Sequence, residues 1–122
     1  MSTEINEKDM IDAFKDSLAV KDKIKARVIL TYIEAVSKKV QKRLLFELVR
    51  SDLEFQLPLL IFLLDQHQSF CQSFKVVEET LIAHAIDYPD HFANVINTEE
   101  INNPSLVITI AEKAKETQQV FE

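Results

Sequence analysis

The chain contains no glycine in its 122 residues, where average usage of about 7% would supply roughly eight or nine. Glycine adopts positive φ without steric cost, so it is the usual residue of tight hairpins and of loops that cradle phosphates. Its absence disfavours β-hairpin folds and glycine-rich nucleotide sites. The architecture that we expect instead is a series of helices joined by short polar turns.

The bulk composition predicts one globular domain over residues 1–122. Hydrophobic residues make up 47% of the chain and charged residues 28%, which is typical of a folded domain rather than a disordered one. No apolar run reaches 18 residues, the first ten residues are mostly polar, and Cys71 is the single cysteine. We therefore expect a cytoplasmic protein without membrane contact. We also expect this domain to be the N-terminal module of a longer protein.

Apolar residues recur at helical spacing, and polar residues mark where helices begin. Asn6 and Asp22 are predicted N-caps, and Asn103 is a third, with Pro104 at the first helical position. No alternating pattern typical of strands competes with this interpretation. We predict seven helices with connections of two to six residues, which favour antiparallel neighbours.

The inner face of each helix follows from the same spacing. In the helix that begins after Asp22 and extends to Val36, we expect one apolar face formed by Ile24, Val28, Tyr32, Ala35 and Val36. Ile29 and Ile33 widen this face, so the helix is expected to contact neighbours on two sides. The run Leu57–Leu64 is apolar on all sides, so it is predicted to be the buried centre. One long amphipathic helix is expected from Phe70 to Ala85.

Two segments of the chain are alike at an offset of 30 residues. They are LAVKDKIKARVILTYI from Leu18 and LVRSDLEFQLPLLIFL from Leu48. Each passes through a turn with aspartate and opens an apolar helix. The matched pairs are Asp22 with Asp52, Ile29 with Leu59, Leu30 with Leu60, Tyr32 with Phe62 and Ile33 with Leu63.

Over residues 18–86 this pattern resembles HEAT or armadillo-type helical repeats, which stack antiparallel helix pairs. Arg27 matches a basic position common in the first helix of a HEAT unit, although Leu57 occupies the matching place in the second unit. The resemblance implies a short right-handed solenoid of stacked hairpins and a surface that binds another protein, not an active site. A closed multi-helix bundle is the alternative.

Few residues carry a pattern typical of catalysis or metal binding. His67 and Cys71 are four residues apart, as metal ligands can be, but a soft site needs more partners than the chain offers. The Asp90–His91 pair is not accompanied by a second histidine–aspartate pair. His84 lies near an apolar stripe, which is typical of a core histidine. We therefore expect no enzyme, no catalytic residue, no metal site and no cofactor. A helical enzyme or small-ligand sensor with a pocket lined by His67, Cys71 or His84 is an alternative.

Charge is distributed unevenly along the chain, although the total is −6. Residues 21–50 carry nine basic and three acidic side chains, whereas residues 51–122 carry three basic and twelve acidic ones. Such asymmetry favours association with a surface of opposite charge. A homodimer held by the opposite charges of the two halves is one further expectation.

The basic block supplies the candidate binding residues. They fall on one predicted helix, where most share a surface, and they are Lys38, Lys39, Lys42, Arg43 and Arg50. We expect a non-enzymatic interaction or scaffold module, regulatory within a bacterial signalling protein, that docks a protein or domain with an acidic surface. Binding of a nucleic-acid backbone through residues 21–50 is the alternative, but nucleic acid is not the expected partner because aromatic residues hardly interleave the cluster.

Overall fold

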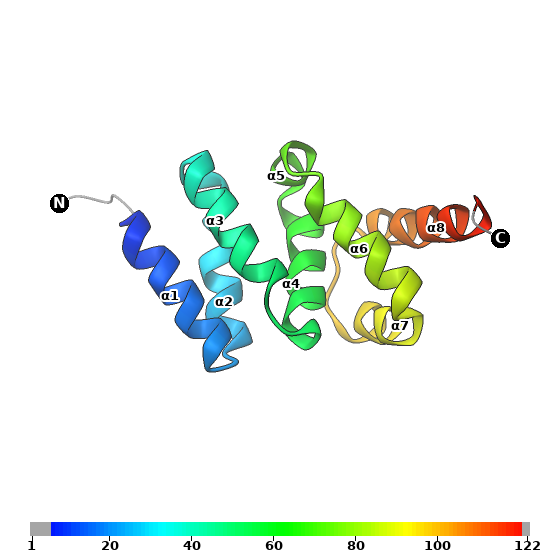
Figure 1. Cartoon of the computed structure of the whole chain (residues 1–122), viewed down its shortest axis with the longest axis horizontal. Helices are drawn as coiled ribbons and strands as arrows, with labels where there is room; N and C mark the ends of the chain where they lie inside the picture. Colours follow the sequence, from blue (N-terminus) through cyan, green and yellow to red (C-terminus); the bar gives the residue numbers. More distant parts are fainter. Residues whose placement is uncertain (1–5, 121–122) are drawn as a thin grey trace. The chain divides into compact units, whose positions relative to one another are not determined.

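The structure is a computed structural model that describes residues 6–120, and it is helical throughout this range (Figure 1). No strand occurs within these residues, so the all-α prediction is confirmed. Each helix in this part of the chain is too short or too polar to cross a lipid bilayer. The helices are α1 (Glu7–Ala19), α2 (Lys23–Leu30), α3 (Lys38–Val49), α4 (Leu53–Gln66), α5 (Gln68–Ser73), α6 (Val76–Asp87), α7 (Pro89–Thr98) and α8 (Pro104–Val120), with a 3-10 turn η1 at Ile33–Ala35.

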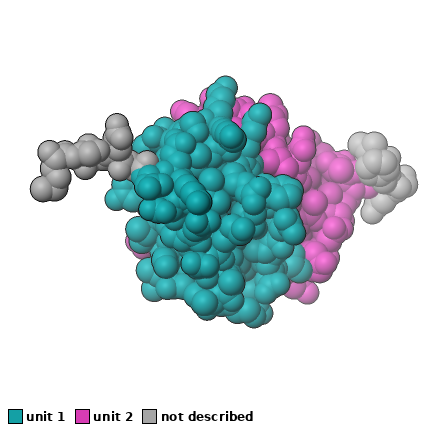
Figure 2. Space-filling model, turned by 60° about the vertical axis from the view of Figure 1, so that its left-hand side comes forward, with its two compact units in different colours: residues 1–59 teal, residues 60–122 magenta. Residues whose placement is uncertain are grey.

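The chain divides into two compact units, residues 1–59 and residues 60–122, coloured separately in Figure 2. We call them unit 1 and unit 2. The boundary falls within α4. The stacking of hairpins into a right-handed solenoid, the HEAT-like repeat and the closed bundle all remain predictions, whereas the helical class is established.

The predicted helix starts agree with the structure. The Oδ1 atom of Asn6 accepts a hydrogen bond from the backbone N–H of Asp9 at 3.1 Å, and Asp22 caps α2 in the same way at 3.0 Å. α8 begins at Pro104 as expected. Phe121, which the spacing assigns to the inner face of the last helix, lies outside the described residues.

Two predicted helices are divided in the structure. The helix expected to run to Val36 ends at Leu30, where the hydroxyl of Thr31 donates to the carbonyl of Arg27 at 3.0 Å and the chain continues into η1. The long helix expected from residue 70 to residue 85 is broken at Phe74, whose backbone leaves the helical region (φ −123°, ψ 82°). Side-chain periodicity persists across both breaks, so it does not reveal them.

Unit 1 is built on α1, α2 and α3. In Figure 1, α1 and α3 run in the same direction and α2 runs in the opposite direction; α1 contacts both of the others. Fully buried side chains form the core of this unit, and they include Phe14, Leu30, Ile33, Leu44 and Leu48. The apolar run predicted to be buried, residues 57–64, is confirmed for residues 57–63, whereas Leu64 at its end is only partly buried.

The apolar face predicted for α2 is wrong for three of its residues, whereas Ile33, which was expected to widen that face, is buried. Ile24, Val28 and Tyr32 are 79%, 54% and 52% exposed, whereas Ala26 and Leu30 are the buried residues of this helix. α2 carries apolar side chains on two faces, and packing against α1 buries the face with the small Ala26. A larger side chain at that position would hold the helices apart, because interiors are close-packed.

The turn between α1 and α2 shows how the chain manages without glycine. Lys21 has φ of 59°, the left-handed conformation that glycine adopts most readily. The N–H groups of Lys21 and Asp22 donate to the carbonyls of Leu18 and Ser17 at 3.3 and 2.8 Å. This pair of hydrogen bonds is a Schellman motif, with lysine at the position where glycine is preferred.

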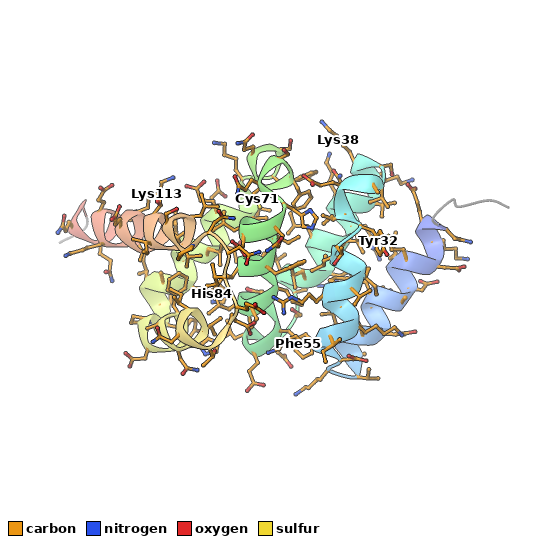
Figure 3. The ribbon with its side chains drawn as sticks, turned by 180° about the vertical axis from the view of Figure 1, so that it is seen from behind. Tyr32, Lys38, Phe55, Cys71, His84 and Lys113 are labelled. Atoms are coloured by element: carbon orange, nitrogen blue, oxygen red, sulfur yellow. The ribbon has the colours of Figure 1, made fainter. Side chains whose placement is uncertain are left out.

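Unit 2 is held together by the packing of α6 on α8 and by a buried carboxylate. Leu63, Val77, Leu81 and Ile110 contribute to its core. On the surface, the ammonium group of Lys113 on α8 pairs with the carboxylate of Glu78 on α6. The side chain of Lys113 is labelled in Figure 3.

The buried carboxylate belongs to Asp65, near the end of α4. Its two oxygens accept hydrogen bonds from the backbone N–H groups of Asn102 and Asn103 at 2.9 and 2.6 Å, and only 4% of the residue is exposed. Burial alone would raise the pKa of this carboxyl, but the hydrogen bonds from Asn102, Asn103 and Gln66 prevail and lower the pKa below its usual value. Asp65 therefore fixes the connection before α8 to α4.

Candidate partner-binding site

The five predicted binding residues are all exposed on α3 or directly after it, but they do not form one cluster. Lys39, Lys42 and Arg43 line a groove between α3 and α1. Lys38, at the start of α3, is not part of the lining and projects away from the ribbon (Figure 3). Arg50 lines a separate recess. Successive helical residues are about 100° apart around the axis, which is why Lys38 and Lys39 face different directions.

The groove has a volume of about 980 Å³ and lies entirely within unit 1. Its α3 wall carries the three basic residues together with Val40 and Phe46. Its α1 wall presents side chains at spacings of three, four and seven residues, which share one face of a helix. These are Lys8, Ile11, Asp12 and Lys15, with Glu7 at the end of the groove.

The electrostatics of the groove are dominated by cations. Five basic and two acidic side chains line it, a net charge of +3, around the apolar surfaces of Ile11, Val40 and Phe46. The Glu7 carboxylate is already engaged, because its two oxygens accept hydrogen bonds from the N–H and hydroxyl of Ser37 at 3.1 and 3.3 Å. Of the two carboxylates that line the groove, Glu7 is thus bound to Ser37 at the start of α3, whereas Asp12 does not take part in this contact.

Two contacts position the arginines of α3. A guanidinium nitrogen of Arg43 lies 3.4 Å from a carboxylate oxygen of Glu47, one turn further along the helix. The guanidinium carbon of Arg50 lies 4.9 Å from the ring centroid of Phe46, a cation–π arrangement. Both contacts are at the surface, so each stabilises the fold only slightly.

The recess that contains Arg50 is smaller and more evenly charged. Its volume is about 360 Å³, and its lining includes Lys15, Lys21 and Arg50 on the positive side and Glu47 and Asp52 on the negative side. Lys21 and Asp52 face each other with 3.7 Å between their charged atoms. Because cations and anions nearly balance here, this recess attracts an acidic surface less than the groove does.

The contribution of α1 to the groove was not predicted. The stripe at residues 8, 11, 12 and 15 is visible in the sequence, but helical spacing also groups Ile11 with Met10 and Phe14. In the structure Phe14 is fully buried whereas Ile11 is only half-buried, so α1 uses both of its sides. The pairing of α1 with α3 brings together residues about thirty positions apart, and helical periodicity carries no information about such pairs.

The residues considered for metal or catalytic chemistry are dispersed. Neither recess is lined by His67, Cys71 or His84. Within residues 6–120, no group of three or more His, Cys, Asp or Glu side chains is placed to hold a metal ion. Cys71 is buried within α5, and the His67 ring packs edge-on against Phe62 with 5.7 Å between ring centroids.

His84 is a buried residue of α6. Its ring centroid lies 6.1 Å from that of Tyr88. Burial lowers the pKa of this imidazole below its usual value, and the nearby His91 lowers it further, while Asp87 opposes the shift. His84 is therefore a core residue of unit 2 that disfavours protonation.

The chain matches no protein family model, no curated protein and no solved structure.

Proposed function

We propose that this chain is a non-enzymatic interaction module that binds an acidic surface of another protein in the groove between α1 and α3. The observation that carries the proposal is the lining of the groove, with five cations around an apolar floor and a net charge of +3. The cations attract an acidic partner, and the accessible apolar surfaces of Ile11 and Phe46 supply area that becomes buried on contact.

The first turn of α3 supports the same proposal. Lys38 and Lys39 lie at the positive end of the helix dipole, and this turn contains no acidic residue of its own. Cations at this end destabilise a helix by about 0.3–1 kcal/mol each. Glu7 offsets part of this cost through its contact with Ser37. Helix stability therefore does not explain these lysines. Lys39 lies in the groove lining, where its charge can attract an acidic partner, whereas Lys38 lies outside that lining.

Several finer statements belong to this proposal. They are the HEAT-like repeat, the right-handed solenoid, a scaffold or regulatory role within a bacterial signalling protein, and a cytoplasmic location. Each depends on the resemblance of residues 18–86 or on composition.

The test is a binding titration of the whole chain with a fluorescein-labelled polyglutamate peptide of about 20 residues at low ionic strength, where surface charges are least screened. The variant Lys39→Glu with Lys42→Glu reverses two lysines of the groove. The matched control, Lys75→Glu with Lys115→Glu, changes the net charge equally at two exposed positions of unit 2. We expect the first pair to weaken binding at least tenfold and the control to change it less than about twofold.

The result that contradicts the proposal is equal loss in both variants, or no measurable binding to the original chain. A duplex DNA oligonucleotide of the same length tests the nucleic-acid alternative. Tighter binding of DNA than of polyglutamate, with a steep dependence on salt, would overturn the proposal in favour of a phosphate-backbone binder.

A further inference from the structure

A second surface of unit 1 has the character of a docking site. Ile24 and Val28 lie one turn apart on α2, Tyr32 lies two residues after the end of the helix, and all three are more than half exposed. We call these three residues the α2 stripe. Figure 3 labels Tyr32 at one end of it. None of the three lines the groove between α1 and α3.

The α2 stripe is apolar at its centre and basic along both sides. Because successive helical residues are about 100° apart, Lys25 lies on one side of Ile24 and Val28, while Lys23 and Arg27 lie on the other. Residues 20–32 contain four basic side chains and one acidic side chain. A single apolar row between two rows of cations is narrow, whereas helices that bind membrane surfaces have wide apolar faces.

We propose that the α2 stripe docks one amphipathic helix of another protein, with apolar side chains along its contact face and aspartate or glutamate beside them. Apolar residues one turn apart form a ridge that fits the groove between the rows of side chains on a second helix. Acidic residues on the flanks of that helix would meet Lys25 on one side and Lys23 and Arg27 on the other. This charge complementarity identifies the occupant.

The charges of α2 argue against a second copy of the same helix. Two α2 stripes in contact would bring basic rows together on both sides, and like charges across an interface are unfavourable. The proposal is independent of the groove, because different residues on a different helix carry it. The two proposals can therefore fail separately.

The probe is a fluorescein-labelled helical peptide of about 15 residues, with leucine along one face and glutamate on both flanks. Its binding is measured on the whole chain with Lys39→Glu and Lys42→Glu already present, so that the groove contributes little. Ile24→Ser with Val28→Ser removes the apolar centre without changing charge. The matched control is Val76→Ser with Ile108→Ser, at two exposed apolar positions of unit 2 that are 39% and 54% exposed.

We expect the α2 pair to weaken binding at least tenfold and the control pair to change it less than about twofold. A peptide with lysine in place of glutamate is expected not to bind. Equal effects of the two pairs would overturn the proposal. So would a dimer of the chain that Ile24→Ser with Val28→Ser dissociates, since the occupant would then be a second copy. Binding to vesicles of phosphatidylcholine and phosphatidylserine that the same pair abolishes would reassign the stripe to a membrane surface.

Discussion

Unit 1 and unit 2 use their charged and apolar side chains differently. Eleven of the fourteen basic residues belong to residues 1–59, whereas residues 60–122 contain three basic and ten acidic side chains. Among the described residues, six of the nine exposed large hydrophobic side chains lie in unit 1, at Val20, Ile24, Val28, Tyr32, Phe46 and Leu53.

Unit 2 uses polar groups for internal contacts. Asp65 is buried and holds the backbone before α8, and Lys113 pairs with Glu78 between two of its helices. In unit 1, Glu7 also makes an internal contact with Ser37, but the groove presents five cations around apolar surface. The difference is that the exposed cations and most of the exposed large hydrophobic side chains are concentrated in unit 1, which is where we propose the binding surfaces.

The largest expected effect separates the two apolar faces of α2. Leu30 is fully buried, so Leu30→Ala should lower the free energy of unfolding by about 2–5 kcal/mol. Ile24→Ala, on the exposed face, should change it by no more than about 0.5 kcal/mol. Urea unfolding followed by circular dichroism measures both. A large loss for Ile24→Ala would show that the α2 stripe is part of the core and would remove it as a docking site.

The next prediction compares two carboxylates. Asp65→Ala leaves two backbone N–H groups without their buried acceptor and should lower the free energy of unfolding by about 2–4 kcal/mol. Asp52→Ala removes an exposed ion pair with Lys21 and should cost less than about 1 kcal/mol. The same urea titration applies. A similar loss of unfolding free energy in the two variants would contradict the distinction between the buried, structural carboxylate of Asp65 and the exposed carboxylate of Asp52.

A smaller effect is expected at the turn after α1. Lys21→Gly removes the steric cost of a left-handed backbone at φ 59°, and it should raise the free energy of unfolding by about 1 kcal/mol or less. The gain is reduced because glycine has more freedom in the unfolded chain. Thermal unfolding measures the change. The control is Lys25→Gly, inside α2, which should instead destabilise by about 1 kcal/mol.

The last prediction concerns pH and unit 2. Because the pKa of His84 is lowered in the folded protein, the unfolded chain takes up a proton at this residue first as pH falls. The contribution of His84 to stability is therefore complete above the usual histidine pKa and is lost as pH falls from there through the folded pKa.

Urea unfolding at about pH 7.5 and about pH 5.5 tests this expectation. The loss of stability between the two conditions should be smaller in His84→Gln than in the original chain. His67 and His91 are present in both proteins, so the difference reports on His84. Identical losses of unfolding free energy in the two proteins would show that protonation of the His84 imidazole does not destabilise the fold.

Local features of this fold were predictable from the residues. Helical spacing and polar caps predicted the starts at Asn6, Asp22 and Pro104, because capping depends on side chains within three positions of each other. The apolar run around Leu60 was predictable as buried because it has no polar side. The breaks after Leu30 and at Phe74 were not, since apolar periodicity continues through both.

The candidate site was predictable only on its α3 side. The basic residues of α3 are conspicuous in the sequence, but Lys38 and Arg50 do not line the groove with Lys39. The role of Asp65 was also missed, because its partners lie more than thirty residues away.

The sequence by itself determined a chain of helices without glycine, its polar caps and its concentration of positive charge between residues 21 and 50. Only the tertiary structure decided which side of α2 is buried, that α1 forms the second wall of the groove, and that Asp65 holds a distant turn. The physical reason is that helix formation and capping depend on neighbours in the sequence. Burial instead depends on which helices pack together, and a helix with two apolar faces satisfies its local preferences whichever face is covered.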